Sequence, residues 1–142
     1  MRFTDSVRNP LARVVKVRGA GADPESVRSA VLESDPALFV GIGHGSECMY
    51  TVECMQPFLS VADPEGRCGN LNADLIPGRV WFLNSCSTGA WLGPSAVKLG
   101  AVAHMGSEEE FFVYVGEDPC SSRASVDVFV PEYAAVLALM SG

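Results

Sequence analysis

Two reactive side chains, Cys86 and His44, each follow a run of apolar residues. Residues 80–83 are Val-Trp-Phe-Leu, and the small, polar stretch after them carries Cys86. Residues 38–42 repeat this plan and lead into His44, which lies between two glycines. A thiolate attacks a carbonyl carbon far better than a thiol does, and histidine titrates in the right range to take the proton. The pairing therefore predicts a thiol nucleophile and its base.

The negatively charged oxygen of an acyl-transfer intermediate needs preorganised hydrogen-bond donors. The backbone N–H groups of Gly45 and Cys86 are the candidates, because a glycine leaves room for a substrate. We also expect a helix to begin at residues 87–88. Its positive end would then lie near Cys86 and favour the thiolate.

Each candidate has a structural alternative. A cysteine is usually a small core residue, and we expect this of four of the five cysteines, whereas polar residues surround Cys86. His44 taken alone is equally consistent with a turn residue that is satisfied by backbone hydrogen bonds. His104 lies inside an apolar run, which favours a packed residue over a catalytic one. Residues 108–110 are all glutamates, for which a solvated loop is the alternative to a substrate or cation site.

Apolar runs that alternate with helical patterns predict an α/β domain with a mainly parallel sheet of about four to six strands. A helix should start at Asp23-Pro24, because Asp23 can cap it and proline suits its first position. The other expected elements are strands at 11–18, 37–42, 79–84, 101–105 and 111–115, a hairpin of 49–53 with 57–61, and helices within 70–75, 90–99 and 121–140. Because parallel sheets bind ligands outside the carboxyl ends of their strands, we expect His44, Cys86 and residues 108–110 at one edge.

The composition limits the classes of function. With 142 residues, 48% of them hydrophobic, the chain suits a single domain spanning 1–142. A net charge of −7 and scattered basic residues oppose nucleic-acid binding, which needs a clustered basic surface. No apolar run approaches the roughly 18 residues of a membrane span, and the N-terminal residues lack the apolar core of a signal peptide. We therefore expect a soluble, cytoplasmic protein with neither a nucleic-acid nor a membrane partner.

The five cysteines are irregularly spaced and include no Cys-x-x-Cys pair. This spacing indicates neither a disulfide framework nor a zinc knuckle. The residues that could form a metal site are Cys48, Cys54, Cys68 and His44. Their spacing matches no compact ligand pattern, which opposes such a site. We therefore expect no metal cofactor.

The two motifs together resemble the caspase-like cysteine peptidases, which include caspases, metacaspases, legumains and gingipains. The pattern of that superfamily is an apolar strand ending in His-Gly, a spacer, and an apolar strand ending in Ala-Cys or Ser-Cys. It matches His44-Gly45 and Ser85-Cys86, with the histidine about 40 residues before the cysteine, near the ~50 of caspases. The resemblance covers residues 37–106.

The resemblance implies a fold and a set of roles. The fold would be a three-layer sandwich, with a mainly parallel caspase-like sheet, helices on both faces and a small β-hairpin. The activity would be hydrolysis of peptide bonds in a peptide or protein substrate, with His44 as general base and acid and Cys86 as nucleophile. Gly45 and Cys86 would supply the oxyanion donors, and Asn84 and Ser85 would belong to the substrate site.

The sequence also departs from the superfamily pattern. Metacaspases and legumains have an acidic residue two positions before the nucleophile and caspases have glutamine, whereas this chain has Asn84. Selectivity for a basic residue would then come from Glu108 and Glu109. Some relatives respond to calcium, for which residues 108–110 or Asp63 and Glu65 are candidates without a recognised ligand spacing. The chain is short, which indicates a minimal member or an excised domain.

Two other functions fit the same residues. The first is a catalytically inactive caspase-like module that binds a peptide at the strand edge. The second is an acyl transferase or amidase that uses the same dyad.

Overall fold

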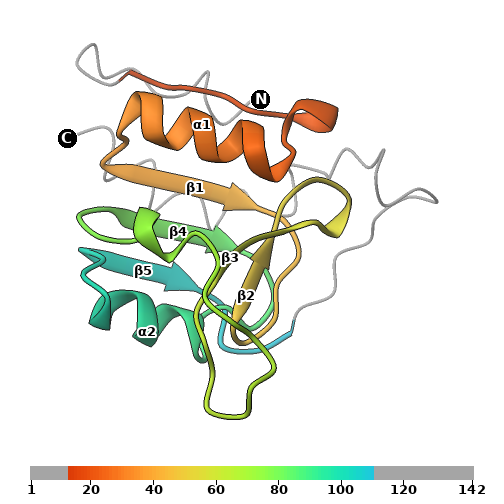
Figure 1. Ribbon diagram of the computed structural model, residues 1–142, viewed down its shortest axis with the longest axis vertical. Helices are drawn as coiled ribbons and strands as arrows, with labels where there is room; N and C mark the ends of the chain where they lie inside the picture. The colour runs from red at the N-terminus through yellow and green to blue at the C-terminus, as the bar shows by residue number, and fades with distance from the viewer. Residues whose placement is uncertain (1–12, 111–142) are drawn as a thin grey trace. The chain divides into compact units, whose positions relative to one another are not determined.

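The structure is a computed structural model that describes residues 13–110. From Val17 onward these residues belong to one compact unit. The strand expected at 111–115 and the helix expected within 121–140 lie outside the described residues, so the single-domain prediction for 1–142 stays a prediction. The elements in chain order are η2 (Gly19–Gly21), α1 (Pro24–Ser34), β1 (Leu38–Ile42), β2 (Met49–Thr51), η3 (Glu53–Met55), β3 (Pro57–Ser60), η4 (Ala73–Leu75), β4 (Val80–Asn84), α2 (Leu92–Lys98) and β5 (Ala103–Gly106) (Figure 1).

A parallel sheet of three strands, in the order β1-β4-β5, forms the centre of this unit (Figure 1). The β1–β4 register pairs Leu38 with Val80 and Ile42 with Asn84, so both strands end at the same edge. Their almost continuous apolar sequences are typical of strands covered by other parts of a protein. The predicted α/β class and parallel sheet are confirmed, although the described residues supply three parallel strands rather than four to six.

The apolar core lies against the face of the sheet that carries Trp81 and Leu83. Both side chains are almost completely buried, and the Trp81 indole donates to the Ile76 carbonyl oxygen at 3.1 Å. Phe39, in register with Trp81 on β1, places its ring centroid 4.7 Å from the Trp81 ring. The indole therefore fills the centre of the core without leaving its own N–H group unsatisfied.

Helix α1 begins where the sequence predicts. Asp23 accepts hydrogen bonds from the N–H groups of the second and third helical residues at 3.1 and 3.0 Å, and Pro24 occupies the first helical position. Val27 and Val31, one turn apart, are the buried residues of this helix. Asp35 then adopts a left-handed conformation, with φ of 42°, and ends the helix before Pro36.

The predicted hairpin is also present. Strands β2 and β3 pair antiparallel, and Tyr50 on β2 is buried together with Phe58 and Leu59 on β3. The predicted short helix at 70–75 is the 3-10 turn η4. The strand at 101–105 is confirmed as β5.

Two expectations are wrong. Residues 13–18 form no strand, and Val14 and Val15 are exposed, so their β-branched side chains have no covering partner among the described residues. Helix α2, Leu92–Lys98, lies within the predicted 90–99, but it does not start at residues 87–88, because Ser87 adopts a left-handed φ of 57° that a continuous helix excludes. Within residues 13–110, none of the helices combines the length and apolar composition needed to cross a bilayer.

Candidate active site

The residues His44 and Cys86 follow the ends of two adjacent parallel strands. Ile42 and Asn84 are the last paired residues of β1 and β4, and the Gly43 N–H extends the pairing by donating to the Asn84 carbonyl oxygen at 3.3 Å. His44 and Cys86 each come two positions after their strand's last paired residue. The structure thus brings both sequence-predicted residues to one edge of the sheet.

Glycines on β1 and beyond it let the hairpin pack closely against the segment that leads to His44. A Cβ atom on Gly41 would lie 2.6 Å from the Tyr50 Oη, and one on Gly43 would lie 2.3 Å from the Thr51 carbonyl oxygen, so both positions face the hairpin. The His44 side chain is exposed.

The residue before Cys86 anchors the turn that carries the thiol. Ser85 is fully buried, and its hydroxyl shares a hydrogen bond with the Thr88 hydroxyl at 3.0 Å. Ser85 also lies beside Gly45, where an added Cβ would come within 3.0 Å of the Ser85 Cβ. Cys86 is half-buried and carries a thiol rather than half of a disulfide.

The backbone around Gly45 leaves one N–H group directed away from the hairpin. Gly45 faces Tyr50 in an antiparallel bridge, in which the His44 carbonyl oxygen accepts from Thr51 N–H and Ser46 N–H donates to Met49, both at 2.9 Å. The opposed residues of such a bridge direct their own N–H and C=O groups outward. Gly45 also lies against Cys86, since an added Cβ would be 2.6 Å from the Cys86 carbonyl oxygen. This placement suits an oxyanion donor.

The turn after Cys86 is tied to the loop after β5. The Ser87 N–H donates to the Glu109 carbonyl oxygen at 3.1 Å, and the Gly89 N–H donates to the Ser107 carbonyl oxygen at 2.7 Å. The side chains of Glu108 and Glu109 are exposed. The loop therefore lies at the edge where the sequence places it, beside Cys86.

A hollow of about 440 Å³ lies next to this loop and is lined in part by Gly89, His104 and Glu108. Burial lowers the pKa of His104 to about 4, so its imidazole is neutral at pH 7. Its Nδ1 lies under Gly93, where an added Cβ would be 2.6 Å away. His104 is thus a packed residue, as its apolar surroundings in the sequence indicate.

Two predicted substrate-site residues are buried. Asn84 and Ser85 have 5% and 0% of their surface exposed, so neither offers an open face to a substrate in this form. The Ser85–Thr88 hydrogen bond indicates that Ser85 supports the turn that carries Cys86. Thr88 itself was not among the predicted residues.

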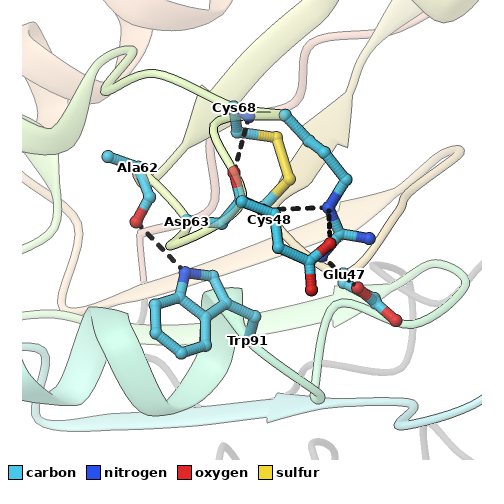
Figure 2. A network of polar contacts seen from close by, with 8 residues as sticks. Glu47, Cys48, Ala62, Asp63, Cys68 and Trp91 are labelled. Atoms are coloured by element: carbon cyan, nitrogen blue, oxygen red, sulfur yellow. Dashed lines mark hydrogen bonds and ion pairs between the residues drawn. A yellow bond between two sulfur atoms is a disulfide. The ribbon is translucent and has the colours of Figure 1, made fainter.

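The expectation that no disulfide framework is present is wrong. Cys48 and Cys68 form a disulfide across 20 residues of sequence, with their Cα atoms 6.1 Å apart (Figure 2). The reason is the hairpin, which returns the chain to the start of β2, so that the Val61 N–H donates to the Cys48 carbonyl oxygen at 3.2 Å. Cys54 is also disulfide-bonded.

This disulfide removes two of the candidate thiolate ligands for a metal ion. The ligand atoms of Cys48, Asp63 and Cys68 lie within 4.8 Å of one another, but the two sulfurs are bonded to each other and are not thiolates. The carboxylates of Asp63 and Glu65, the alternative calcium ligands, pair with Arg67 at 2.9 and 3.1 Å. The Arg67 guanidinium thus already pairs with both carboxylates.

No family model, curated protein or solved structure matches this chain.

Proposed function

We propose that this protein is a caspase-like cysteine endopeptidase with His44 and Cys86 as its dyad. The observation that carries the proposal is their placement two residues beyond the ends of adjacent, in-register strands, where Gly45 lies against the Cys86 carbonyl oxygen. His44 is exposed and Cys86 is half-buried, so a peptide can reach both.

The first half of the reaction forms an acyl-enzyme. His44 takes the proton of the Cys86 thiol, and the thiolate attacks the carbonyl carbon of the scissile amide to form a C–S bond. The negative charge moves to the carbonyl oxygen, where the Gly45 and Cys86 N–H groups donate hydrogen bonds. Collapse of this intermediate breaks the C–N bond, and the His44 imidazolium protonates the leaving amine.

The second half consumes water. Neutral His44 removes a proton from a water molecule, which attacks the thioester carbon. Collapse of the second tetrahedral intermediate breaks the C–S bond and releases a carboxylic acid, while the proton returns to the sulfur. The protein ends in its starting state.

Substrate selectivity is part of the proposal. Glu108 lines the hollow beside the Cys86 turn, and the Glu109 backbone is bound to that turn. Carboxylates at this position favour a lysine or arginine side chain near the scissile bond. Asn84 and Ser85 then act indirectly, by shaping the turn from beneath.

The three-layer sandwich also belongs to this proposal. The described core covers the Trp81 face of the sheet, while Leu38, Val40 and Met105 on the other face remain only partly buried. A second helical layer on that face is the part of the sandwich that we propose.

The cytoplasmic location remains a prediction. The Cys48–Cys68 disulfide opposes it, because disulfides persist mainly in oxidising compartments.

The direct test is cleavage of a positional peptide library by the wild type and by Cys86→Ala, His44→Ala and Ser29→Ala variants. Ser29 is exposed on α1 and serves as the control. We expect the wild type and the control to cleave equally and the other two to lose at least ~100-fold in kcat/KM. Equal cleavage by Cys86→Ala would contradict the proposal. Peptide binding without cleavage by the wild type would support the inactive binding module instead, and turnover of small amides but not of peptides would support an amidase or acyl transferase.

A further inference from the structure

The loop of residues 62–68, here called the clamp, is attached to the segment that follows His44 (Figure 2). Cys68 is bonded to Cys48, and the Arg67 guanidinium pairs with the Glu47 carboxylate at 2.6 Å. Glu47 and Cys48 follow Gly45 within three residues. The clamp therefore holds the chain immediately after the candidate base and its oxyanion donor.

The clamp is also attached to the segment that follows Cys86. Figure 2 shows the indole of Trp91 turned toward Ala62, and its N–H donates to the Ala62 carbonyl oxygen at 3.2 Å. The next residue, Leu92, donates its N–H to the Glu47 carbonyl oxygen at 2.7 Å. The clamp, Glu47 and Trp91 thus connect the two strand ends that carry the dyad.

A buried carboxylate organises the interior of the clamp. The Asp63 side chain is inaccessible to solvent and accepts hydrogen bonds from the Cys68 N–H at 2.8 Å and the Arg67 Nε at 2.9 Å. Asp63 thus joins the backbone of Cys68 to the side chain of Arg67, the two residues that attach the clamp to residues 47–48.

The disulfide is the strongest of these attachments. About half of the side-chain surface of Arg67 and Glu47 is exposed, and exposed ion pairs of this kind contribute little to stability. A disulfide across 20 residues restricts the loop far more strongly. Without it, the clamp would keep its contacts to Trp91 but would hold residues 44–48 only weakly.

We propose that the Cys48–Cys68 disulfide is a redox-sensitive positioning device, so that peptide cleavage requires this disulfide intact while Cys86 is a thiol. This inference rests on the proposed function. Acyl transfer is sensitive to displacements of about 1 Å between its reacting groups. Loss of this covalent attachment leaves residues 44–48 held by hydrogen bonds and the Arg67–Glu47 ion pair, and is expected to let His44 and Gly45 shift relative to Cys86.

The chemistry of the device is thiol–disulfide exchange with a dithiol reductant. A thiolate of the reductant attacks Cys68, which is partly exposed, whereas Cys48 is 3% exposed. A mixed disulfide forms and Cys48 leaves as a thiolate; the second thiol of the reductant then displaces Cys68. The protein gains two electrons and two protons in this reaction, and the reductant becomes a cyclic disulfide. Peptide cleavage should then be fastest at an intermediate redox potential. Mild reduction keeps Cys86 as a thiol and leaves the Cys48–Cys68 disulfide intact, whereas strong reduction breaks the disulfide and opens the clamp.

The test compares the wild type with a Cys48→Ser/Cys68→Ser variant and with Cys54→Ser, which removes a different disulfide-bonded cysteine. The kcat/KM for a cleaved peptide is measured across glutathione and dithiothreitol redox buffers. We expect the wild type and Cys54→Ser to lose at least ~10-fold when Cys48 and Cys68 are reduced. We expect the double variant to stay at the low value and to show no further loss. Equal rates for the wild type and the double variant at every potential would overturn the inference.

A second measurement separates this inference from the proposed function. Hydrogen exchange of the amides of residues 44–47 and 86–92 reports the clamp whether or not the protein cleaves peptides. Faster exchange in these segments of the double variant, but not in Cys54→Ser, is expected. Unchanged exchange in the double variant would overturn the clamp. Faster exchange with no peptide cleavage by any form would overturn the proposed function and leave the clamp supported.

Discussion

The substitution Gly45→Ala tests the packing between the two strand ends. A Cβ at this position would lie 2.6 Å from the Cys86 carbonyl oxygen, 2.8 Å from the Thr88 Cγ2 and 3.0 Å from the Ser85 Cβ. Ser85 and Thr88 are fully buried, so neither can move aside without disturbing the turn. Overpacking of this kind costs about 1–3 kcal/mol in the free energy of unfolding. The displaced turn carries Cys86, so cleavage should also fall by about 100-fold.

The matched control is Gly21→Ala, because Gly21 has no atom within 4 Å of an added Cβ and does not have a left-handed φ. Urea unfolding followed by fluorescence measures the stability of each variant, and peptide turnover measures kcat/KM. The control should change the unfolding free energy by less than ~0.5 kcal/mol. If Gly45→Ala matched the control in both measurements, the strand ends would not be packed as described.

Three further predictions concern charge. The Cys68 N–H and the Arg67 guanidinium hold the pKa of Asp63 below its ordinary value. The stability that the Asp63 carboxylate contributes is therefore complete above about pH 4. It is lost as the pH falls through the lower folded-state pKa. Asp63→Asn should therefore flatten the acid decline of the urea midpoint, and parallel profiles would contradict this. Burial lowers the pKa of His104 to about 4, so the unfolded chain takes up the proton first and stability falls from about pH 6.5 toward pH 4. An NMR titration of His104 checks the value, and a midpoint near 6.5 would refute it. Glu108→Gln should reduce any preference for lysine or arginine over neutral residues by about 10-fold, whereas Glu33→Gln on α1 should not; equal preferences in all three proteins would oppose a role for Glu108.

Much of the sheet and its first helix could be predicted from local patterns. Asp23 and Pro24 define the start of α1, because an N-cap and a proline at the first helical position act within one turn. The apolar runs before His44 and Cys86 predict β1 and β4, and parallel pairing of successive runs places the two residues at one edge. These inferences need only short stretches of sequence and one rule about sheets.

The parts that could not be predicted depend on contacts between distant residues. Pairing of Cys48 with Cys68 requires the direction in which the chain leaves the hairpin, and the spacing of the cysteines does not reveal it. The absence of a helical start at residues 87–88 follows from the left-handed Ser87, a conformation that serine rarely adopts and that its neighbours in the sequence do not indicate. Arg67 lies four residues after Asp63, but its second partner, Glu47, comes from the other side of the hairpin.

The most direct test of the dyad is the rate at which a peptide-like thiol electrophile labels the protein. We expect a single label on Cys86 in the wild type and a rate at least ~100-fold lower in His44→Ala, because His44 takes the thiol proton. Mass spectrometry of the labelled peptide gives both the site and the rate. Equal rates in the two proteins, or a label on a residue other than Cys86, would contradict the pairing of His44 with Cys86.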